Sequence, residues 1–252
     1  MRSIKWTTLV DVCHVLLRTR AHYSASPPIV NILDLLFPKR CLGCGKIEKY
    51  FCIGCVGKIR VIEERETICP LCERPAIHGA THPRCKTDDC IDGLTSFFHY
   101  EGIIQKAVKA LKYRFVSDVA NEFISLIPQL SLPLSEDSVI VPIPLHSSRL
   151  RFRGFNQAKE LGKFFTKRFS ISLCSTILVR TKASKPQVEM KDKNERLDNL
   201  KNAFSIHNSA FPMPHSVVLF DDVFTTGATM RAAATVLKRA GATFVWGITM
   251  AR

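Results

Sequence analysis

The chain has 252 residues, 46% hydrophobic and 23% charged, which is enough for one sizeable domain and a smaller module. This composition excludes collagen-like, low-complexity and mainly disordered proteins. The formal net charge is +14, and residues 149–201, with 14 Lys and Arg against five Asp and Glu, contribute +9 of it. A single basic block favours a local anionic ligand, such as a phosphate or a nucleic acid, over a generally basic surface.

The first 28 residues carry no pattern that defines a function. Arg2 and Lys5 precede a partly apolar stretch, but Asp11 and His14 interrupt it, so a secretory signal peptide is not expected. No apolar run reaches the roughly 18 residues that a transmembrane helix needs. We therefore expect residues 1–28 to be a leader of unknown role.

Cysteines are concentrated in one short segment, since eight of the ten lie between residues 41 and 90. A CxxC turn directs two thiolates to one side of a tight loop, and two such turns supply the tetrahedral sulfur cage that Zn²⁺ accepts. The eight cysteines therefore predict two structural zinc ions with four ligands each. The predicted ligands form three CxxC pairs and one wider pair: Cys41 and Cys44, Cys52 and Cys55, Cys69 and Cys72, Cys85 and Cys90.

Disulfides are the main alternative for an even number of cysteines, but they are typical of secreted proteins. A single thioredoxin-type redox pair does not account for three CxxC turns. The pairing of the ligands stays open. The sequential scheme groups the first four and the last four cysteines, whereas the two CxxC pairs of residues 52–72 also approach the spacing of a zinc ribbon.

Two histidines lie close enough to replace a cysteine in the second site, namely His78 and His82. We leave them out of the predicted ligand set because most histidines in such loops are solvated. A cage of four thiolates has no open coordination position, so the predicted zinc ions are structural and not catalytic. Residues 41–90 offer no long apolar face, and we expect this module to depend on metal for folding.

The most specific chemistry lies in a strand–turn–helix pattern near the end of the chain. The apolar run Val217–Phe220 ends in Asp221 and Asp222, and a turn rich in Thr and Gly precedes a helical pattern from Met230. A turn that leads into a helix directs free backbone N–H groups at an anion, so a phosphate is the expected occupant. The neighbouring carboxylates suit a vicinal diol. Together these groups predict a site for a ribose 5-phosphate.

The same string resembles the signature with which type I phosphoribosyltransferases bind phosphoribosyl pyrophosphate (PRPP): a hydrophobic strand, Asp-Asp, Val and then Thr-Thr-Gly-x-Thr. The resemblance implies an α/β fold in which a largely parallel sheet is flanked by helices. It also implies that the turn binds the 5′-phosphate of PRPP, carried with Mg²⁺, and that the acidic pair binds the ribose hydroxyls. The implied PRPP-binding residues are Asp221, Asp222, Thr225, Thr226, Gly227, Ala228 and Thr229.

Another strand is expected to begin at Val139, and arginines occupy every second position from 149 to 153 in the segment that follows it. We expect Arg149, Arg151 and Arg153 to lie in a loop at the end of that strand, followed by a helix through Lys167. There they would stabilise a departing pyrophosphate or contact DNA phosphates. A solvated basic surface is the alternative for any one of these arginines.

The polar stretch 179–204 is long for a compact domain, which is typical of a functional loop. Type I phosphoribosyltransferases carry a flexible loop that closes over the reaction centre, and this stretch is the natural candidate. Its Lys182 and Lys185 are further candidates for contact with pyrophosphate or DNA phosphates.

Other motifs narrow the resemblance to the ComF competence family, from about residue 29 to the end. They are Leu-Leu-Phe-Pro-x-x-Cys-Leu-Gly-Cys-Gly from Leu35, Tyr100-Glu-Gly, Pro142-x-Pro-Leu-His, Arg153-Gly-Phe-Asn-Gln-Ala and the DDVFTTGAT string from Asp221. The resemblance implies a double zinc ribbon over 29–92 and a phosphoribosyltransferase-like domain over 93–252. It further implies a cytoplasmic bacterial protein, held near the inner membrane through partners of the competence machinery.

Two functional hypotheses result. In the first, a PRPP-binding ComF protein handles single-stranded DNA during uptake; the basic block contacts the DNA, and Phe152, Phe155, Phe164 and Phe165 supply stacking surfaces or core. In the second, the protein is an active phosphoribosyltransferase that moves ribose 5-phosphate from PRPP to an unknown nucleophile, with no direct role on DNA. Such enzymes rely on positioning and electrostatics, so the lack of an obvious nucleophile does not exclude catalysis.

Overall fold

A computed structural model describes residues 38–112, 116–129, 132–181, 203–207 and 212–252. The expected leader of residues 1–28 lies outside these ranges. The chain divides after residue 38, and residues 39–252, the second unit, are compact. No helix among the described residues combines the length and the apolar character needed to cross a membrane.

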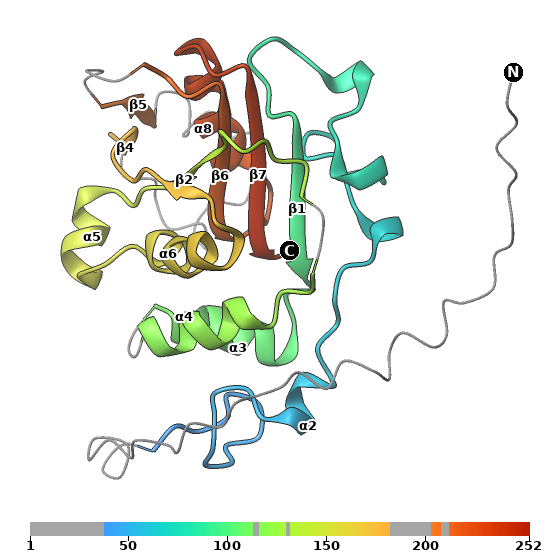
Figure 1. Cartoon of the computed structure of the whole chain (residues 1–252), viewed down its shortest axis with the longest axis vertical. Helices are drawn as coiled ribbons and strands as arrows, with labels where there is room; N and C mark the ends of the chain where they lie inside the picture. Colours follow the sequence, from blue (N-terminus) through green and yellow to red (C-terminus); the bar gives the residue numbers. More distant parts are fainter. Residues whose placement is uncertain (1–37, 113–115, 130–131, 182–202, 208–211) are drawn as a thin grey trace, which may run out of the picture. The chain divides into compact units, whose positions relative to one another are not determined.

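The second unit alternates strands and helices (Figure 1). Its elements are, in chain order, α2 (Ile53–Val56), the 3₁₀ turns η2 (Glu64–Glu66), η3 (Ile77–Gly79) and η4 (Pro83–Cys85), β1 (Gly93–Phe98), α3 (Gly102–Ala110), α4 (Val116–Ser125), β2 (Val139–Pro142), α5 (Ser147–Arg153), α6 (Gln157–Phe169), β3 (Ser172–Leu173), β4 (Leu178–Arg180), β5 (Phe204–Ile206), β6 (Ser216–Val223), α8 (Ala228–Arg239) and β7 (Phe244–Ala251).

A five-stranded sheet in the order β1-β7-β6-β2-β3 forms the centre of this unit, and all its pairings are parallel. Strands β4 and β5 form a separate antiparallel pair. Helices cover both faces of the central sheet, with α3, α4 and α6 on one face and α8 on the other (Figure 1). The parallel α/β sheet flanked by helices, predicted from the resemblance, is confirmed.

Strand β6 shows why the apolar run is continuous. Val218 and Phe220 pack with α3, α4 and α6, whereas Val217 and Leu219 pack with α8 on the opposite face. Because successive side chains of a strand point to opposite faces, a strand covered on both sides is apolar at every position until it leaves the core. The acidic pair begins where that cover ends.

Aromatic stacking anchors the cysteine-rich segment to the helices of the second unit. Phe51 lies in the same apolar cluster as α4 and stacks on Phe123, with ring centroids 5.7 Å apart. Phe123 stacks in turn on Phe98 of β1 at 5.9 Å. The segment therefore has apolar contacts in addition to its metal ligands.

Neighbouring residues of α8 make two ion pairs of different burial. Lys238 Nζ lies 2.6 Å from Asp92 Oδ2, and both side chains are only 8% exposed. The Asp92 carboxylate also accepts the N–H of Val245, so the pair ties α8 to the entry of β1 and to β7. Arg239 lies 2.6 Å from Asp89, but its side chain is 71% exposed.

We expect Lys238→Met to lower the free energy of unfolding by about 3 kcal/mol, because it leaves a buried carboxylate without its main counter-charge. Arg239→Met, the matched control, should cost less than about 1 kcal/mol because water screens its pair. Urea denaturation of both variants measures the difference. Equal losses would contradict this account of the two pairs.

Candidate functional site

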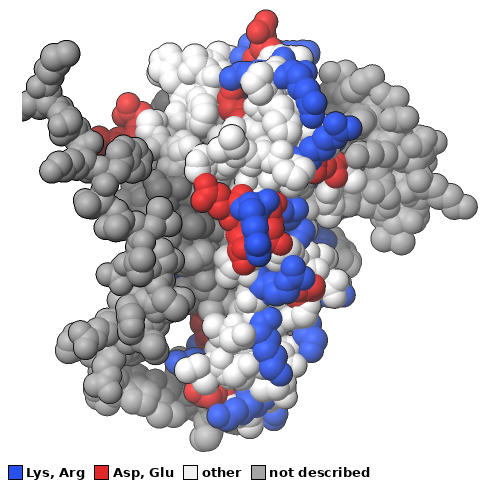
Figure 2. Space-filling view, turned by 90° about the vertical axis from the view of Figure 1, so that its right-hand side faces the viewer, with Lys and Arg blue, Asp and Glu red and all other residues white. Residues whose placement is uncertain are grey.

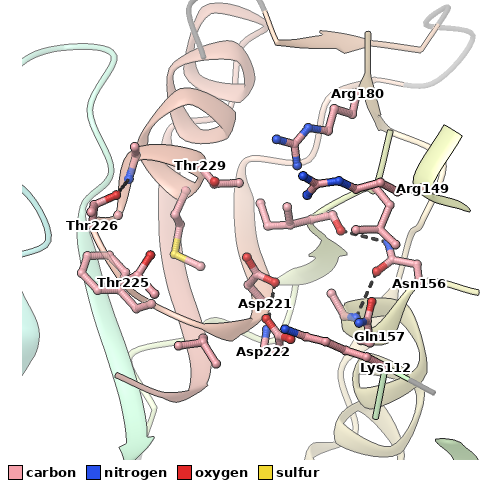
Figure 3. A pocket seen from close by; sticks show the side chains of 18 of the residues that line it. Lys112, Arg149, Asn156, Gln157, Arg180, Asp221, Asp222, Thr225, Thr226 and Thr229 are labelled. Carbon is pink, nitrogen blue, oxygen red and sulfur yellow. Dashed lines mark hydrogen bonds between the residues drawn. The ribbon is translucent and has the colours of Figure 1, made fainter. Parts of the chain in front are cut away.

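A cavity of about 580 Å³ lies at the edge of the sheet where the parallel strands end. Its wall includes the end of β6, the turn that follows and the start of α8, opposite residues of α5 and α6 (Figure 3). The register places Pro142, the last residue of β2, beside Phe220 of β6. Ligands of open α/β sheets bind in the crevice outside these carboxyl ends.

All seven residues assigned to PRPP binding from the sequence line this one cavity. The turn among them depends on Gly227, whose φ of +67° is left-handed. A Cβ there would lie 2.5 Å from the Phe224 ring, so a side chain at this position would be strained and would clash. The N–H groups of the first turn of α8 have no acceptor within the helix, and its residues Ala228, Thr229 and Met230 line the cavity. A helix N-terminus of this kind is suited to an anion.

The acidic pair is held in a constrained arrangement. The backbone N–H of Asp222 donates to Asp221 Oδ1 at 2.9 Å. Burial and the neighbouring charge of Asp222 raise the pKa of Asp221 well above its usual range, while the charge of Arg180 opposes the shift. A pair of carboxyl groups in this state gains stability from a ligand that brings hydroxyl donors or a cation.

The arginines expected in a loop lie instead on the short helix α5, which the sequence analysis did not predict. Helical periodicity separates them. Arg149 and Arg153, four residues apart, line the cavity, whereas Arg151 is exposed and lies outside its lining. The prediction of a basic cluster at this position is therefore confirmed for Arg149 and Arg153. The prediction of a loop that presents all three arginines together is wrong.

Two cavity cations were not among the candidates named from the sequence. Lys112 follows α3, and Arg180 ends β4, at the start of the stretch 179–204 that was expected to be a loop. Figure 3 shows Arg180 beside Arg149, across from the acidic pair, and Lys112 extending toward that pair. Burial, followed by the charge of Arg149, lowers the pKa of Arg180, and Asp221 opposes the shift. The expected candidates Lys182 and Lys185 lie outside the described residues.

Polar and aromatic groups complete the wall. Gln157 is 3% exposed, and its Nε2 has no hydrogen-bond partner among the described residues, which leaves a donor for a ligand. Of the aromatic residues considered for base stacking, Phe152 is 90% exposed and lines the cavity, whereas Phe165 is fully buried in the core. Phe152 is therefore available for stacking and Phe165 is not.

The first metal site gathers Cys41, Cys44, Cys52 and Cys55, with all four sulfur atoms within 4.8 Å of one another. The sulfur atoms of Cys44 and Cys52 are 3.7 Å apart. This matches the edge of about 3.8 Å of a tetrahedron whose Zn–S bonds are about 2.3 Å. Burial alone would raise the pKa of the Cys41 thiol, but hydrogen bonds with backbone groups of Cys44 and Cys52 outweigh it and lower that pKa to about 6.

The second metal site differs from the predicted set. The structure gathers Cys69, Cys72, His82 and Cys85, and not Cys90. His82 Nδ1 lies 3.2 Å from the sulfur of Cys72, while its Nε2 lies 3.0 Å from the Pro75 carbonyl oxygen. A ligating histidine commonly donates its other N–H in this way, which fixes the ring and its tautomer.

The turn η4 explains the difference. It closes His82 and Cys85 into a pair with the spacing of a CxxC turn, which the four intervening residues before Cys90 do not allow. The buried sulfur of Cys90 instead accepts the N–H of Thr87 at 3.4 Å and contacts the Ile91 carbonyl. A His-x-x-Cys spacing was the sequence signal that could have identified this ligand.

The donor sets fit two structural zinc ions, because each offers four Cys or His ligands and no carboxylate. A family model for the double zinc ribbon domain matches residues 32–86. The fold and these two sites together define an α/β protein of phosphoribosyltransferase-like architecture that carries a zinc ribbon.

Sequence similarity to known proteins identifies the family within this class. The chain is 31% identical to competence protein ComFC of Bacillus subtilis over 205 residues, which cover 78% of this chain and 81% of that protein. It is 30% identical to the DNA utilization protein YhgH of Salmonella typhi, over 74% of this chain and 84% of that protein. It is 36% identical to competence protein F of Haemophilus influenzae over a shorter region, which covers 49% of this chain and 53% of that protein. The chain belongs to the ComF competence family.

We expect the purified protein to contain about two equivalents of zinc, and His82→Ala to retain about one, because a site with three ligands holds the ion weakly. Cys90→Ala should retain two, since its sulfur lies outside both donor sets. Elemental analysis after gel filtration measures the content. Loss of one zinc from Cys90→Ala, with two retained in His82→Ala, would restore the ligand set predicted from the sequence.

Proposed function

We propose that this protein binds PRPP together with Mg²⁺ in the cavity at the carboxyl edge of the sheet, and that this binding serves the handling of single-stranded DNA during natural competence. The observation that supports the proposal most is the composition of one cavity. The turn Thr225–Thr229, which we call the phosphate-binding turn under this proposal, lines one cavity together with a pair of carboxyl groups and two arginines of α5.

Each part of PRPP has a matching part of this cavity. The 5′-phosphate lies at the turn Thr225–Thr229, where hydroxyls and the N–H groups of α8 donate to its oxygens. The ribose hydroxyls donate to Asp221 and Asp222. Mg²⁺, which prefers oxygen ligands, would neutralise part of the charge of the pyrophosphate, and the cations of α5 and β4 would meet the rest.

The names of the relatives support the second part of the proposal. Two are called competence proteins and one a DNA utilization protein. The proposal includes a role at the cytoplasmic side of the uptake machinery. It also includes the division into a double zinc ribbon over 29–92 and a phosphoribosyltransferase-like domain over 93–252.

We place the DNA contact at the mouth of the cavity and not on the cysteine-rich segment. In that segment Arg60 pairs with Glu66 and Glu101, and Arg65 pairs with Glu63. Figure 2 shows a face on which Lys and Arg alternate with Asp and Glu, and such a mixed surface attracts a polyanion weakly. Arg149, Arg153 and the exposed Phe152 offer charge and a stacking surface together.

Transfer of the ribosyl group is the second candidate function, and the buried Gln157 amide together with the arginines favours it. A nucleophile would form a bond to the anomeric carbon while the bond to the pyrophosphate oxygen breaks, and the pyrophosphate would leave with the bonding electrons. Arg149 and Arg180 lie where they would stabilise that charge. Release of pyrophosphate from PRPP in the presence of single-stranded DNA or nucleobases tests this reaction.

We expect Asp221→Asn/Asp222→Asn to lose the thermal stabilisation that Mg-PRPP confers on the wild type. At a ligand concentration of 100 Kd that stabilisation is about 2.7 kcal/mol. Without ligand, the variant should melt above the wild type. The raised pKa of Asp221 means that ionising it in the folded state costs stability as pH rises above about 4, its unfolded-state value, and Asn removes this cost.

The two readouts move in opposite directions, so a misfolded variant cannot mimic the expected result. Asp137→Asn is the control, because Asp137 is exposed and lies outside the cavity. An unchanged PRPP shift in the double variant would refute the assignment of the acidic pair.

For DNA, we expect Arg149→Gln to weaken binding of a single-stranded oligonucleotide and to reduce the slope of log K against log salt by about 0.7, the value for one lost phosphate contact. Arg151→Gln removes the same charge from the same helix but outside the cavity, and should leave the slope unchanged. Fluorescence anisotropy at several salt concentrations measures both. Equal slopes for the two variants would contradict a contact at the cavity mouth.

A further inference from the structure

The Cys69–Cys72 turn of the second metal site is linked to the phosphate-binding turn through one side chain. Arg231 of α8 donates from Nη1 to the carbonyl oxygens of Pro70 and Leu71, at 3.0 and 3.4 Å, and these two residues lie between Cys69 and Cys72. The other nitrogen, Nη2, donates to the carbonyl oxygen of Thr226 at 2.7 Å. One guanidinium group therefore joins the backbone of a metal-binding turn to the backbone of the phosphate-binding turn.

Apolar and backbone contacts reinforce this connection. Leu71 packs on the apolar cluster that contains Ala228 of the phosphate-binding turn and its flanking residues Phe224 and Met230. A Cβ on Gly227 would lie 3.4 Å from the Pro70 carbonyl oxygen. The two turns are thus closely packed, and the Arg231 guanidinium and the Leu71 side chain connect them, so a displacement of one is expected to displace the other.

The guanidinium group of Arg231 is suited to fix the orientation of the two turns. A guanidinium is planar and rigid, and it donates to several acceptors in fixed directions, which a lysine ammonium on a flexible stem does not. The Pro70 and Leu71 carbonyls occupy their positions because Cys69 and Cys72 hold the ends of the turn. That restraint is strong only when both sulfurs share a metal ion, since metal binding supplies the folding energy of such turns.

We propose that metal at the Cys69–Cys72–His82–Cys85 site sets the geometry of the phosphate-binding turn through Arg231, so that occupancy of this site and phosphate binding are coupled. Arg231 is then a positioning residue, which contacts neither the metal ion nor the phosphate ligand. The identity of the phosphate ligand rests on the proposed function, whereas the connection between the two turns does not.

Coupling of this kind is reciprocal: a ligand at the phosphate-binding turn must tighten metal binding at the second site by the factor by which the metal tightens ligand binding. The first metal site is an internal control. Its segment packs against α4, where the Phe51 N–H donates to Glu122.

The first experiment measures the connection without any ligand. Hydrogen exchange of the full-length, zinc-loaded protein is followed by mass spectrometry in peptides covering residues 223–230. We expect Arg231→Met to raise exchange there about fivefold or more, and Arg231→Lys to give a smaller increase. Arg239→Met removes an exposed arginine of the same helix and should change nothing. Equal exchange in wild type and Arg231→Met overturns the proposal.

The second experiment measures reciprocity site by site. The protein is exposed to a zinc-selective chelator, with Mg²⁺ in excess, and to a thiol-alkylating reagent. Modification is followed in separate peptides with and without Mg-PRPP. We expect PRPP to slow alkylation of Cys69, Cys72 and Cys85 about fivefold or more in the wild type, and not in Arg231→Met. Alkylation of Cys41 and Cys44 should not respond. Equal protection of both sites, or protection that persists in Arg231→Met, overturns the proposal.

The two experiments separate the coupling from the proposed function. If Mg-PRPP fails to stabilise the wild type in a thermal melt, the PRPP proposal fails, while the exchange measurement still decides the role of Arg231. If Mg-PRPP binds with equal affinity to wild type and Arg231→Met, the proposed function stands and the coupling is refuted.

Discussion

The parallel direction of the central strands is the constraint on which the rest of the structure depends. Parallel strands end at one edge, so the chain after β2 and the chain after β6 leave the sheet side by side. The cavity forms between these exits, with α8 supplying its helix end from one side and α5 its arginines from the other. Reversal of one strand would carry either the carboxyl groups or the arginines to the far edge of the sheet.

Local patterns made part of this site predictable. The acidic pair and the Thr-Gly turn are contiguous, and their chemistry depends on short-range geometry that Gly227 alone largely determines. Strand β6 was predictable from its continuous apolar run, and helix α8 from its helical period. The strands β1 and β7 and the helices α3 and α4 carried no polar signature that drew attention to them, although their apolar content fills the core.

The groups that escaped prediction are those whose role depends on distant parts of the chain. Lys112 and Arg180 reach the cavity only because the fold returns α3 and β4 to the edge of the sheet. Arg151 was grouped with its neighbours because alternation does not distinguish a loop from a short helix. Cys90 was preferred to His82 because the prediction counted cysteines. In the structure the ligand is selected by spacing, because η4 brings His82 and Cys85 together.

The bonds of Arg231 run to main-chain oxygens on both sides. Every residue has such an oxygen, so position 70 can change in evolution without loss of the contact, and no compensating change at position 231 is needed. A search for correlated substitutions between the two turns would therefore find little at position 70, even though they are physically joined. The structure can therefore show that one turn depends on the other where a sequence alignment shows no correlated substitutions.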